Sequence, residues 1–255
     1  MGQRSAIEWT ESTWNPWMGC EKVSPGCAHC YMYREQRQYG HDPDVIRRSK
    51  TKFYDPLRWA EPRLVFTCSW SDWFHPAADR WRDEAWEIVQ ATPHLTYQIL
   101  TKRPEFVEER LPVDWGDGYA NVWLGVSVEN SRFTWRAQVL RELPAVVRFV
   151  SAEPLLGSLF SDEGKRQVLD LTDIDWLIVG GESGPGARRM KLEWALELSE
   201  ACNMWATAFF MKQLGTVAAR ELQARDRKGG DIGVFPPELR RREMPLVRRT
   251  ALVMT

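Results

Sequence analysis

The chain has 255 residues and 44% hydrophobic residues, enough for one large α/β domain with a full core that needs no disulfides. Its net charge of −1 argues against a general polyanion-binding protein, although the 34 Lys and Arg residues leave room for a local basic face. The polar N-terminus and the lack of an apolar run of about 18 residues predict a soluble, cytoplasmic protein with reduced cysteines and no membrane contact.

Residues 6–14 alternate apolar and polar side chains and predict a first strand, which leads into a loop that contains Cys20, Cys27 and Cys30. Prolines and glycines exclude a regular element from this loop and provide turns that let the sulfurs converge. Three thiolates favour a thiophilic metal or an iron–sulfur cluster over Mg²⁺ or Ca²⁺. A closed zinc site needs a fourth ligand, and His29 is poorly placed beside Cys30, so we expect an open metal position. Zinc and simple reduced thiols remain the alternatives.

A helix is predicted over 31–39, followed by an insertion over 41–61 that is rich in Lys and Arg. The insertion is either a solvated charged loop or a loop that contacts phosphate. From residue 64 onward, apolar β-branched runs alternate with amphipathic stretches. The predicted strands are 64–68, 95–100, 122–128, 146–152, 174–180 and 206–211, and the predicted helices include 77–91, 104–111, 133–143 and 192–203.

This alternation predicts a parallel sheet with right-handed crossovers. We therefore expect an α/β fold, a partial or nearly closed parallel (β/α) barrel of about six to seven units. A doubly wound sheet is disfavoured because no glycine-rich nucleotide fingerprint follows the first strand. The expected organisation is a single domain over 1–255, with the insertion at 41–61 and a C-terminal cap or tail at 225–255. Nucleic-acid contact by the arginines of 240–249 is an alternative role for that tail.

Every predicted strand ends in a polar segment, which in a β/α barrel places all of them at the mouth where active sites are built. Ser, Asp and Asn are also ordinary helix N-caps, so a single segment would mean little. Four tryptophans next to these segments, Trp14, Trp17, Trp70 and Trp73, are either core residues or stacking platforms. Cys68 and Cys202 are expected to be small buried residues. Besides the cysteine loop, the polar segments are 69–72, 101–103, 127–130, 151–153, 180–183 and 212–213.

The cysteine loop has the form TWNPxxGCxxxSPGCxxCY, and SWSDWFH, LTKRP, LGVSVEN, SAEPLLG, GGESG and FMKQLG follow along the chain. These motifs resemble a small, often phage-encoded branch of the radical S-adenosylmethionine (SAM) superfamily. Most of that superfamily has the spacing CxxxCxxC, whereas six residues separate Cys20 from Cys27 here. The resemblance implies a [4Fe–4S] cluster on the three cysteines, SAM on its open iron, and an external one-electron donor.

Such an enzyme must hold the SAM carboxylate, ammonium and ribose. Lys102 or Arg103 is expected at the carboxylate. The expected ammonium acceptors are Ser69, Ser71 and Asp72, and the expected ribose acceptors are Ser127, Glu129, Asn130 or Glu153. In the superfamily a GGE-type segment near the second strand usually contacts the ammonium, whereas here Gly180, Gly181 and Glu182 follow the sixth predicted strand. This departure makes a substrate contact by Glu182 equally plausible.

The resemblance to a phage-associated branch implies that the enzyme rearranges or isomerises a hypermodified thymine in phage DNA, in the host cytoplasm if the protein is phage-encoded. The base would have to leave the stack to reach the barrel centre. Glu182 and Lys212 are then the expected catalytic groups near the base substituent. The alternatives are a radical lyase that acts on a DNA lesion, an enzyme for a free nucleotide or small metabolite, and, in another class, a zinc-stabilised nucleic-acid-binding module.

Overall fold

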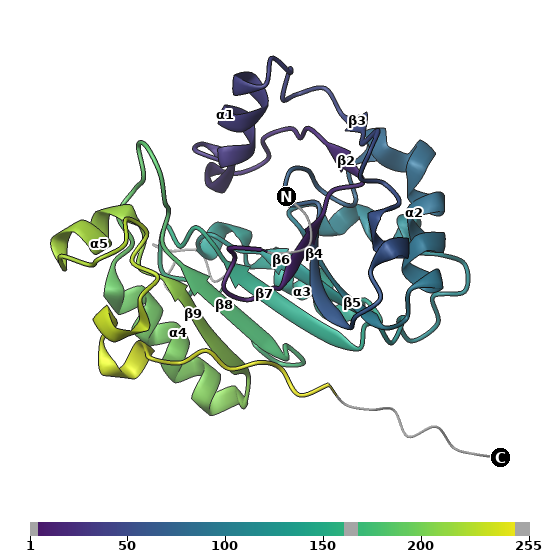
Figure 1. Ribbon diagram of the computed structural model, residues 1–255. Coiled ribbons are helices and arrows are strands. Elements are labelled where there is room, and N and C mark those ends of the chain that lie inside the picture. The colour runs from purple at the N-terminus through teal and green to yellow at the C-terminus, as the bar shows by residue number, and fades with distance from the viewer. Residues whose placement is uncertain (1–4, 161–167, 248–255) are drawn as a thin grey trace.

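Seven parallel strands form one sheet that curls into a half-barrel flanked by helices (Figure 1). The computed structural model describes residues 5–160 and 168–247. The strands lie side by side in chain order without reversal, which distinguishes the sheet from a doubly wound one. The predicted partial parallel β/α barrel is thereby confirmed. In spatial order the strands are β1 (Ser12–Trp14), β4 (Arg63–Thr67), β5 (Leu95–Thr101), β6 (Val122–Ser127), β7 (Val147–Ala152), β8 (Trp176–Gly180) and β9 (Ala208–Gln213).

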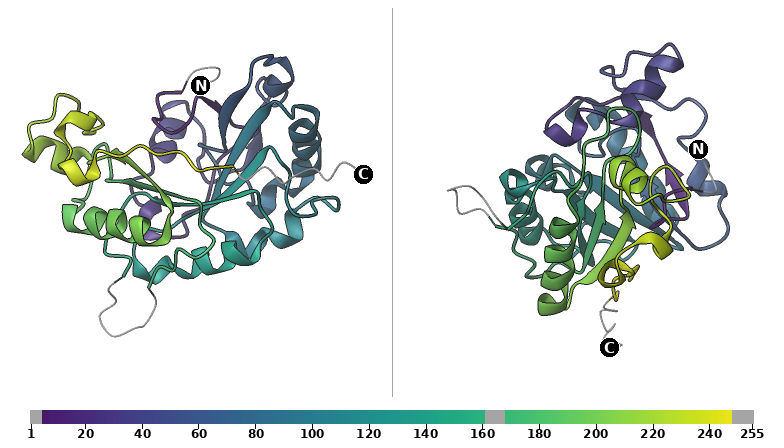
Figure 2. Two further views of the ribbon diagram at one scale, coloured as in Figure 1. Left: turned by 90° about the horizontal axis from the view of Figure 1, so that it is seen from below. Right: turned by 90° about the vertical axis from the view of Figure 1, so that its left-hand side faces the viewer.

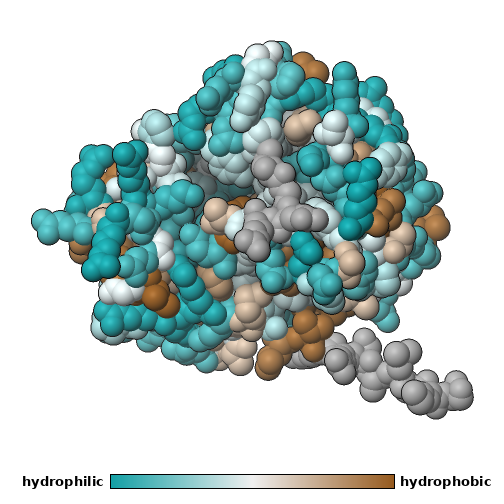
Figure 3. All heavy atoms as spheres, viewed as in Figure 1, coloured by the Kyte–Doolittle hydropathy of each residue, from teal (hydrophilic) through white to brown (hydrophobic). Residues whose placement is uncertain are grey.

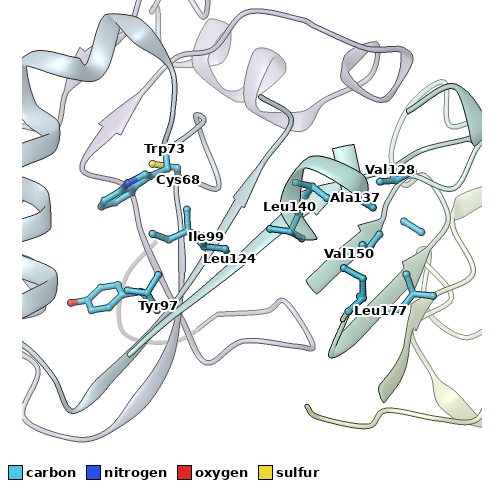
Figure 4. Packing of buried hydrophobic residues seen from close by; sticks show 14 of the residues in the cluster. Cys68, Trp73, Tyr97, Ile99, Leu124, Val128, Ala137, Leu140, Val150 and Leu177 are labelled. Atoms are coloured by element: carbon cyan, nitrogen blue, oxygen red, sulfur yellow. The ribbon is translucent and has the colours of Figure 1, made fainter. Parts of the chain in front are cut away.

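The outer face of the sheet packs against α2 (Asp79–Ala91), α3 (Trp135–Glu142) and α4 (Leu192–Trp205) (Figure 2). Alternate strand residues such as Ile99, Leu124 and Leu177 are buried there beside Leu140 of α3 (Figure 4). Because successive strand residues point to opposite faces, the residues between them point into the half-barrel. Two further helices, α1 (Tyr31–Gln38) and α5 (Thr216–Glu221), lie apart from this layer, near the carboxyl ends of the strands (Figure 1).

The inner face has an aromatic layer, to which β4, β6, β7, β8 and β9 each contribute one ring. Its rings contact one another at centroid distances such as 5.8 Å between Trp176 and Phe210. Gly125 on β6 is required here, because a Cβ at that position would collide with the ring of Phe149. This layer closes the half-barrel below, so the strand ends above it are where a ligand can enter. The rings are those of Phe66, Trp123, Phe149, Trp176 and Phe210, joined by Trp9.

Several predicted elements are shorter than expected. The first strand covers Ser12–Trp14 rather than 6–14, because Trp9 turns away to join the aromatic layer. The helix predicted over 104–111 is instead two short 3₁₀ turns, η4 (Pro104–Phe106) and η5 (Glu108–Arg110). Pro112 follows directly and disfavours a helical conformation at the residue before it. Helix α5 was not predicted.

The insertion at 41–61 is tied to the body of the protein. Its strand β3 (Arg47–Arg48) pairs with β2 (Trp17–Met18), and η2 (Asp55–Arg58) follows. Arg48 forms a bidentate ion pair with Glu84 of α2, with N–O distances of 2.6 and 2.7 Å. These contacts fix part of the insertion, whereas the charged side chains of Lys50, Lys52 and Arg58 are exposed.

The C-terminal segment covers the free edge of β9. Arg242 forms an antiparallel bridge with Phe210 and donates hydrogen bonds to the carbonyls of Met211, Lys212 and Gly230. Covering an edge strand in this way protects its unpaired backbone groups. The predicted tail beyond residue 247, with Arg248 and Arg249, lies outside the described residues. In the part of the chain that the structure describes, no helix is long and apolar enough to cross a membrane.

Candidate functional site

A cavity of about 1290 Å³ opens at the carboxyl ends of the strands, between the cysteine loop and the end of α5. In a parallel β/α fold this is the end at which ligands bind. In Figure 3 the visible surface on this side of the molecule is mainly hydrophilic. The cysteine loop, the polar segments after β4, β5, β7, β8 and β9, and Ser127 at the end of β6 all contribute to the wall. The convergence of polar strand ends predicted from sequence is therefore present for most of these segments.

Cys20, Cys27 and Cys30 all face this cavity. Burial raises the pKa of Cys20 to about 12, and the negative charges of Asp72 and the two other thiols act in the same direction. Burial likewise raises the pKa of Cys30, an effect that Lys102 opposes. These effects favour the protonated thiols of Cys20 and Cys30, so their ionisation would need a cation to compensate the buried negative charge. Among the described residues, no set of three His, Cys, Asp or Glu side chains is grouped closely enough to hold a single metal ion.

The end of β4 holds the start of the cysteine loop in place. Gly19 donates its N–H to the carbonyl of Trp70 at 3.0 Å, and the Ser71 hydroxyl donates to the carbonyl of Gly19 at 2.6 Å. The Tyr31 hydroxyl donates to the carbonyl of Ser69 at 2.8 Å. Ser69 and Ser71 line the cavity, and both also serve as contacts for the loop.

Asp72 joins the two loops that follow β4 and β5 through hydrogen bonds to its carboxylate. One carboxylate oxygen accepts hydrogen bonds from the Thr101 hydroxyl at 2.7 Å and from the N–H of Phe74 at 3.0 Å. The other accepts from the N–H of Lys102 at 3.0 Å. Only 5% of Asp72 is exposed. These contacts fix the loops after β4 and β5 relative to each other.

Glu129, after β6, supports the cysteine loop from below. It is fully buried and accepts a hydrogen bond from Ser24 at 2.5 Å and ion pairs from Arg136 at 3.0 Å and Lys102 at 3.5 Å. Gly26 packs so closely on the Glu129 carboxylate that a Cβ there would collide with it. Glu129 is not among the cavity-lining residues. Its neighbour Asn130, also outside the lining, accepts from the N–H of Arg132 as an N-cap.

Glu182, after β8, holds the other end of the loop. Its carboxylate accepts from the backbone and side chain of Arg188 at 2.6–2.8 Å and lies 3.1 Å from Nδ1 of His29. Arg188 also donates to the carbonyl of Pro25 at 2.9 Å. Burial by itself would raise the pKa of Glu182, but the hydrogen bonds from Arg188 and His29 outweigh it and lower that pKa to about 2. Glu182, His29 and Arg188 form what we call the loop clamp.

The remaining predicted site residues project from the inner face above the aromatic layer. Lys212 of β9 forms an ion pair with Glu153 at 2.8 Å, and Ser151 donates to the same carboxylate at 3.3 Å. Ser127 lies on the same face and is 1% exposed. This group combines one cation, one carboxylate and two hydroxyls at the cavity wall.

Three of the four tryptophans singled out by sequence belong to the core. Trp14, Trp17 and Trp73 are at most 1% exposed and pack against one another at centroid distances of 5.1–5.6 Å. Trp70 alone of the four lines the cavity. Cys68 is buried as expected and also lies in the cavity wall, whereas Cys202 is buried in α4.

A family model described as "Protein of unknown function (DUF5131)" matches residues 4–233, which is most of the chain. The chain belongs to this DUF5131 family. No curated protein and no solved structure matches it. The match covers the cysteine loop and all seven strands, so the cavity is built from the part of the chain that defines the family.

Little in the sequence of this DUF5131 chain pointed to the loop clamp. The sequence context of His29 indicates at most a zinc ligand, and the only local signal for Arg188 is the ARR stretch at 187–189, which closely follows the GGESG motif. A short cationic stretch between α5 and residue 230 was also missed. The available signal was the RDRK sequence at 225–228, where three of four residues are basic.

Proposed function

We propose that this protein is a radical SAM enzyme that binds a [4Fe–4S] cluster through Cys20, Cys27 and Cys30. The observation that carries the proposal is that these three thiols face one cavity at the carboxyl ends of a parallel half-barrel. Soft sulfur donors suit iron–sulfur chemistry, and three cysteines leave the fourth iron open for a ligand. The donor set therefore fits the cluster, because each thiolate would bind a different iron.

When bound, the cluster would supply an electron from an external donor that cleaves SAM into methionine and a 5′-deoxyadenosyl radical. The chain's own task is to bind and orient SAM beside the open iron. Lys102 lies in the cavity wall near Cys30 and is the proposed partner of the SAM carboxylate, which would share its ammonium group with Glu129 at 3.5 Å. Ser127 and Glu153 remain the proposed acceptors for the ribose hydroxyls, because both line the cavity.

The hydrogen bonds and ion pairs described above change the roles that we propose for the other predicted SAM-binding and catalytic residues. Asp72, Glu129 and Glu182 hold the loops that carry the cysteines, so we assign them positioning roles. Lys212 stays a proposed catalytic residue, since it lies on the inner face where a substrate would sit. Its ion pair with Glu153 offers both a donor and an acceptor for proton transfer without an isolated buried charge.

Anaerobic reconstitution of the purified protein tests the proposal, with Cys27→Ala as the variant and Cys202→Ala as the matched control. We expect about four irons and four sulfides per wild-type or control chain, and a brown colour. Cys27→Ala should lose the iron, the sulfide and the colour. A colourless wild-type protein that binds one zinc would support the alternative of a zinc-stabilised nucleic-acid-binding module.

A further inference from the structure

Five basic side chains line the cavity, and together we call them the basic wall. It consists of Arg34 on α1, Arg220 on α5, and Arg225, Arg227 and Lys228 in the following loop. All five are exposed. Within residues 5–160 and 168–247, none of them forms an ion pair with a carboxylate. Their positive charges therefore face the cavity and the solvent at its opening.

The other cations of the cavity differ in this respect. Lys102 pairs with Glu129 at 3.5 Å, and Lys212 pairs with Glu153 at 2.8 Å. Arg103 lies 3.8 Å from a carboxylate oxygen of Glu21. These inner cations already have carboxylate partners, and Lys102 and Lys212 are assigned above to SAM and the substrate, whereas the five side chains of the basic wall have no carboxylate partner among the described residues.

Acidic groups near the basic wall do not neutralise it. Asp226 turns its carboxylate to the backbone N–H groups of Lys228, Gly230 and Asp231, at 2.9–3.1 Å. This arrangement builds the turn from which the neighbouring basic side chains project. Glu8 and Glu35 also line the cavity, and among the ion pairs of the described residues none joins either of them to the basic wall. Among the described lining residues, five cations of the basic wall and four carboxylates, those of Glu8, Glu35, Asp72 and Asp226, form no ion pair, so the unpaired charge of the lining is positive.

The two basic clusters singled out by sequence have other partners. Arg48 of the insertion pairs with Glu84. Arg240 donates to the carbonyls of Phe235 and Gly233, and Arg242 donates to backbone carbonyls beside β9. Arg248 and Arg249 lie outside the described residues. Among the described residues, neither of these two clusters lines the cavity, whereas all five side chains of the basic wall do.

We propose that the basic wall binds the phosphodiester backbone of a polynucleotide, whose reacting nucleotide enters the cavity. Exposed, flexible cations at the rim suit successive phosphates of a strand, which position a nucleic acid without reading its sequence. A nucleotide held by its backbone at the rim can swing its base inward, as base-modifying enzymes require. The reaction inside the cavity rests on the proposed function, whereas binding at the rim does not.

The test is fluorescence anisotropy of labelled 20-nucleotide DNA and RNA strands with the reconstituted protein across salt concentrations. The variant is Arg225→Gln/Arg227→Gln/Lys228→Gln. The matched control, Arg37→Gln/Lys50→Gln/Arg132→Gln, removes the same charge from exposed positions outside the cavity lining.

We expect the variant to bind at least tenfold more weakly than wild type and the control to bind like wild type. For single strands, each phosphate contact contributes about 0.7 to the magnitude of the slope of log affinity against log salt concentration. The variant removes three cations, so the magnitude of this slope should fall by about 2. Tighter binding of DNA or of RNA identifies the substrate polymer. Equal affinity of all three proteins, or complete competition by mononucleotides at equal phosphate concentration, would overturn the proposal. Iron content and SAM cleavage are measured separately on the same samples. They test the proposed function independently of polynucleotide binding by the basic wall.

Discussion

Replacing Glu182 with Gln tests whether this residue holds the cysteine loop rather than a ligand. The substitution keeps the size of the side chain and removes the charge that Arg188 and His29 contact. Only 6% of Glu182 is exposed, so water cannot replace these contacts readily. We expect Glu182→Gln to lower the stability of the metal-free protein, before any ligand is bound.

The size of the effect follows from the pKa of Glu182, which lies at about 2 instead of 4.5. Each pKa unit corresponds to about 1.4 kcal/mol, which gives an upper value of about 3.5 kcal/mol. Arg188 and His29 are each about a third exposed, so solvent screens the interaction and about 2 kcal/mol is expected. For a chain of this length that corresponds to a fall in Tm of about 4–8 °C.

Urea unfolding of reduced, metal-free protein at pH 7, followed by tryptophan fluorescence, measures this difference. Glu221→Gln is the matched control, because Glu221 pairs with Arg189 on the exposed surface and should change stability by less than about 0.5 kcal/mol. If Glu182→Gln unfolds like the control while its SAM affinity falls, Glu182 is a ligand-binding residue and the loop-clamp interpretation is wrong.

The same contact predicts a pH dependence. Because the folded pKa of Glu182 lies below its ordinary value, its contribution to stability is complete above about pH 4.5 and is lost as the pH falls toward 2. The stability difference between wild type and Glu182→Gln should therefore narrow between pH 5 and pH 2. A difference that stays constant across this range would contradict the assigned cause.

Three further substitutions have expected outcomes. Gly125→Ala should destabilise the protein by about 1–3 kcal/mol in urea unfolding, because its Cβ would collide with the ring of Phe149; a neutral result would contradict the packing of the aromatic layer. Asp72→Ala should cost about 3 kcal/mol by the same measurement, since it leaves three donors without their acceptor, and wild-type stability would refute its structural role. Ser127→Ala should keep its iron content and stability but bind SAM about fivefold more weakly in anaerobic calorimetry, and unchanged affinity would remove Ser127 from the site.

The fold followed from sequence because each strand and most helices carry a local pattern. The run at 122–128 and the helix at 192–203, for example, appear as β6 and α4 with ends shifted by one or two residues. Elements whose ends depend on distant contacts were predicted less well. The first strand is short because Trp9 joins an aromatic layer contributed by five other strands, which no local pattern reveals.

The location of the cavity could be predicted from sequence, because polar residues that follow parallel strands meet at one edge of a sheet. The role of each residue could not, because it depends on partners far away in sequence. Ser24 meets Glu129 across 105 residues, and His29 meets Glu182 across 153. A carboxylate after a strand can bind a ligand or hold a loop, and only its contacts distinguish the two.

Product analysis of the reconstituted, reduced protein with SAM tests the central claim most directly. Under anaerobic conditions with a one-electron donor such as dithionite, the account predicts slow formation of 5′-deoxyadenosine by wild type and Cys202→Ala. Cys27→Ala should form none. Chromatography that finds only methylthioadenosine or S-adenosylhomocysteine, or equal 5′-deoxyadenosine from Cys27→Ala, would contradict the assignment of a radical SAM enzyme.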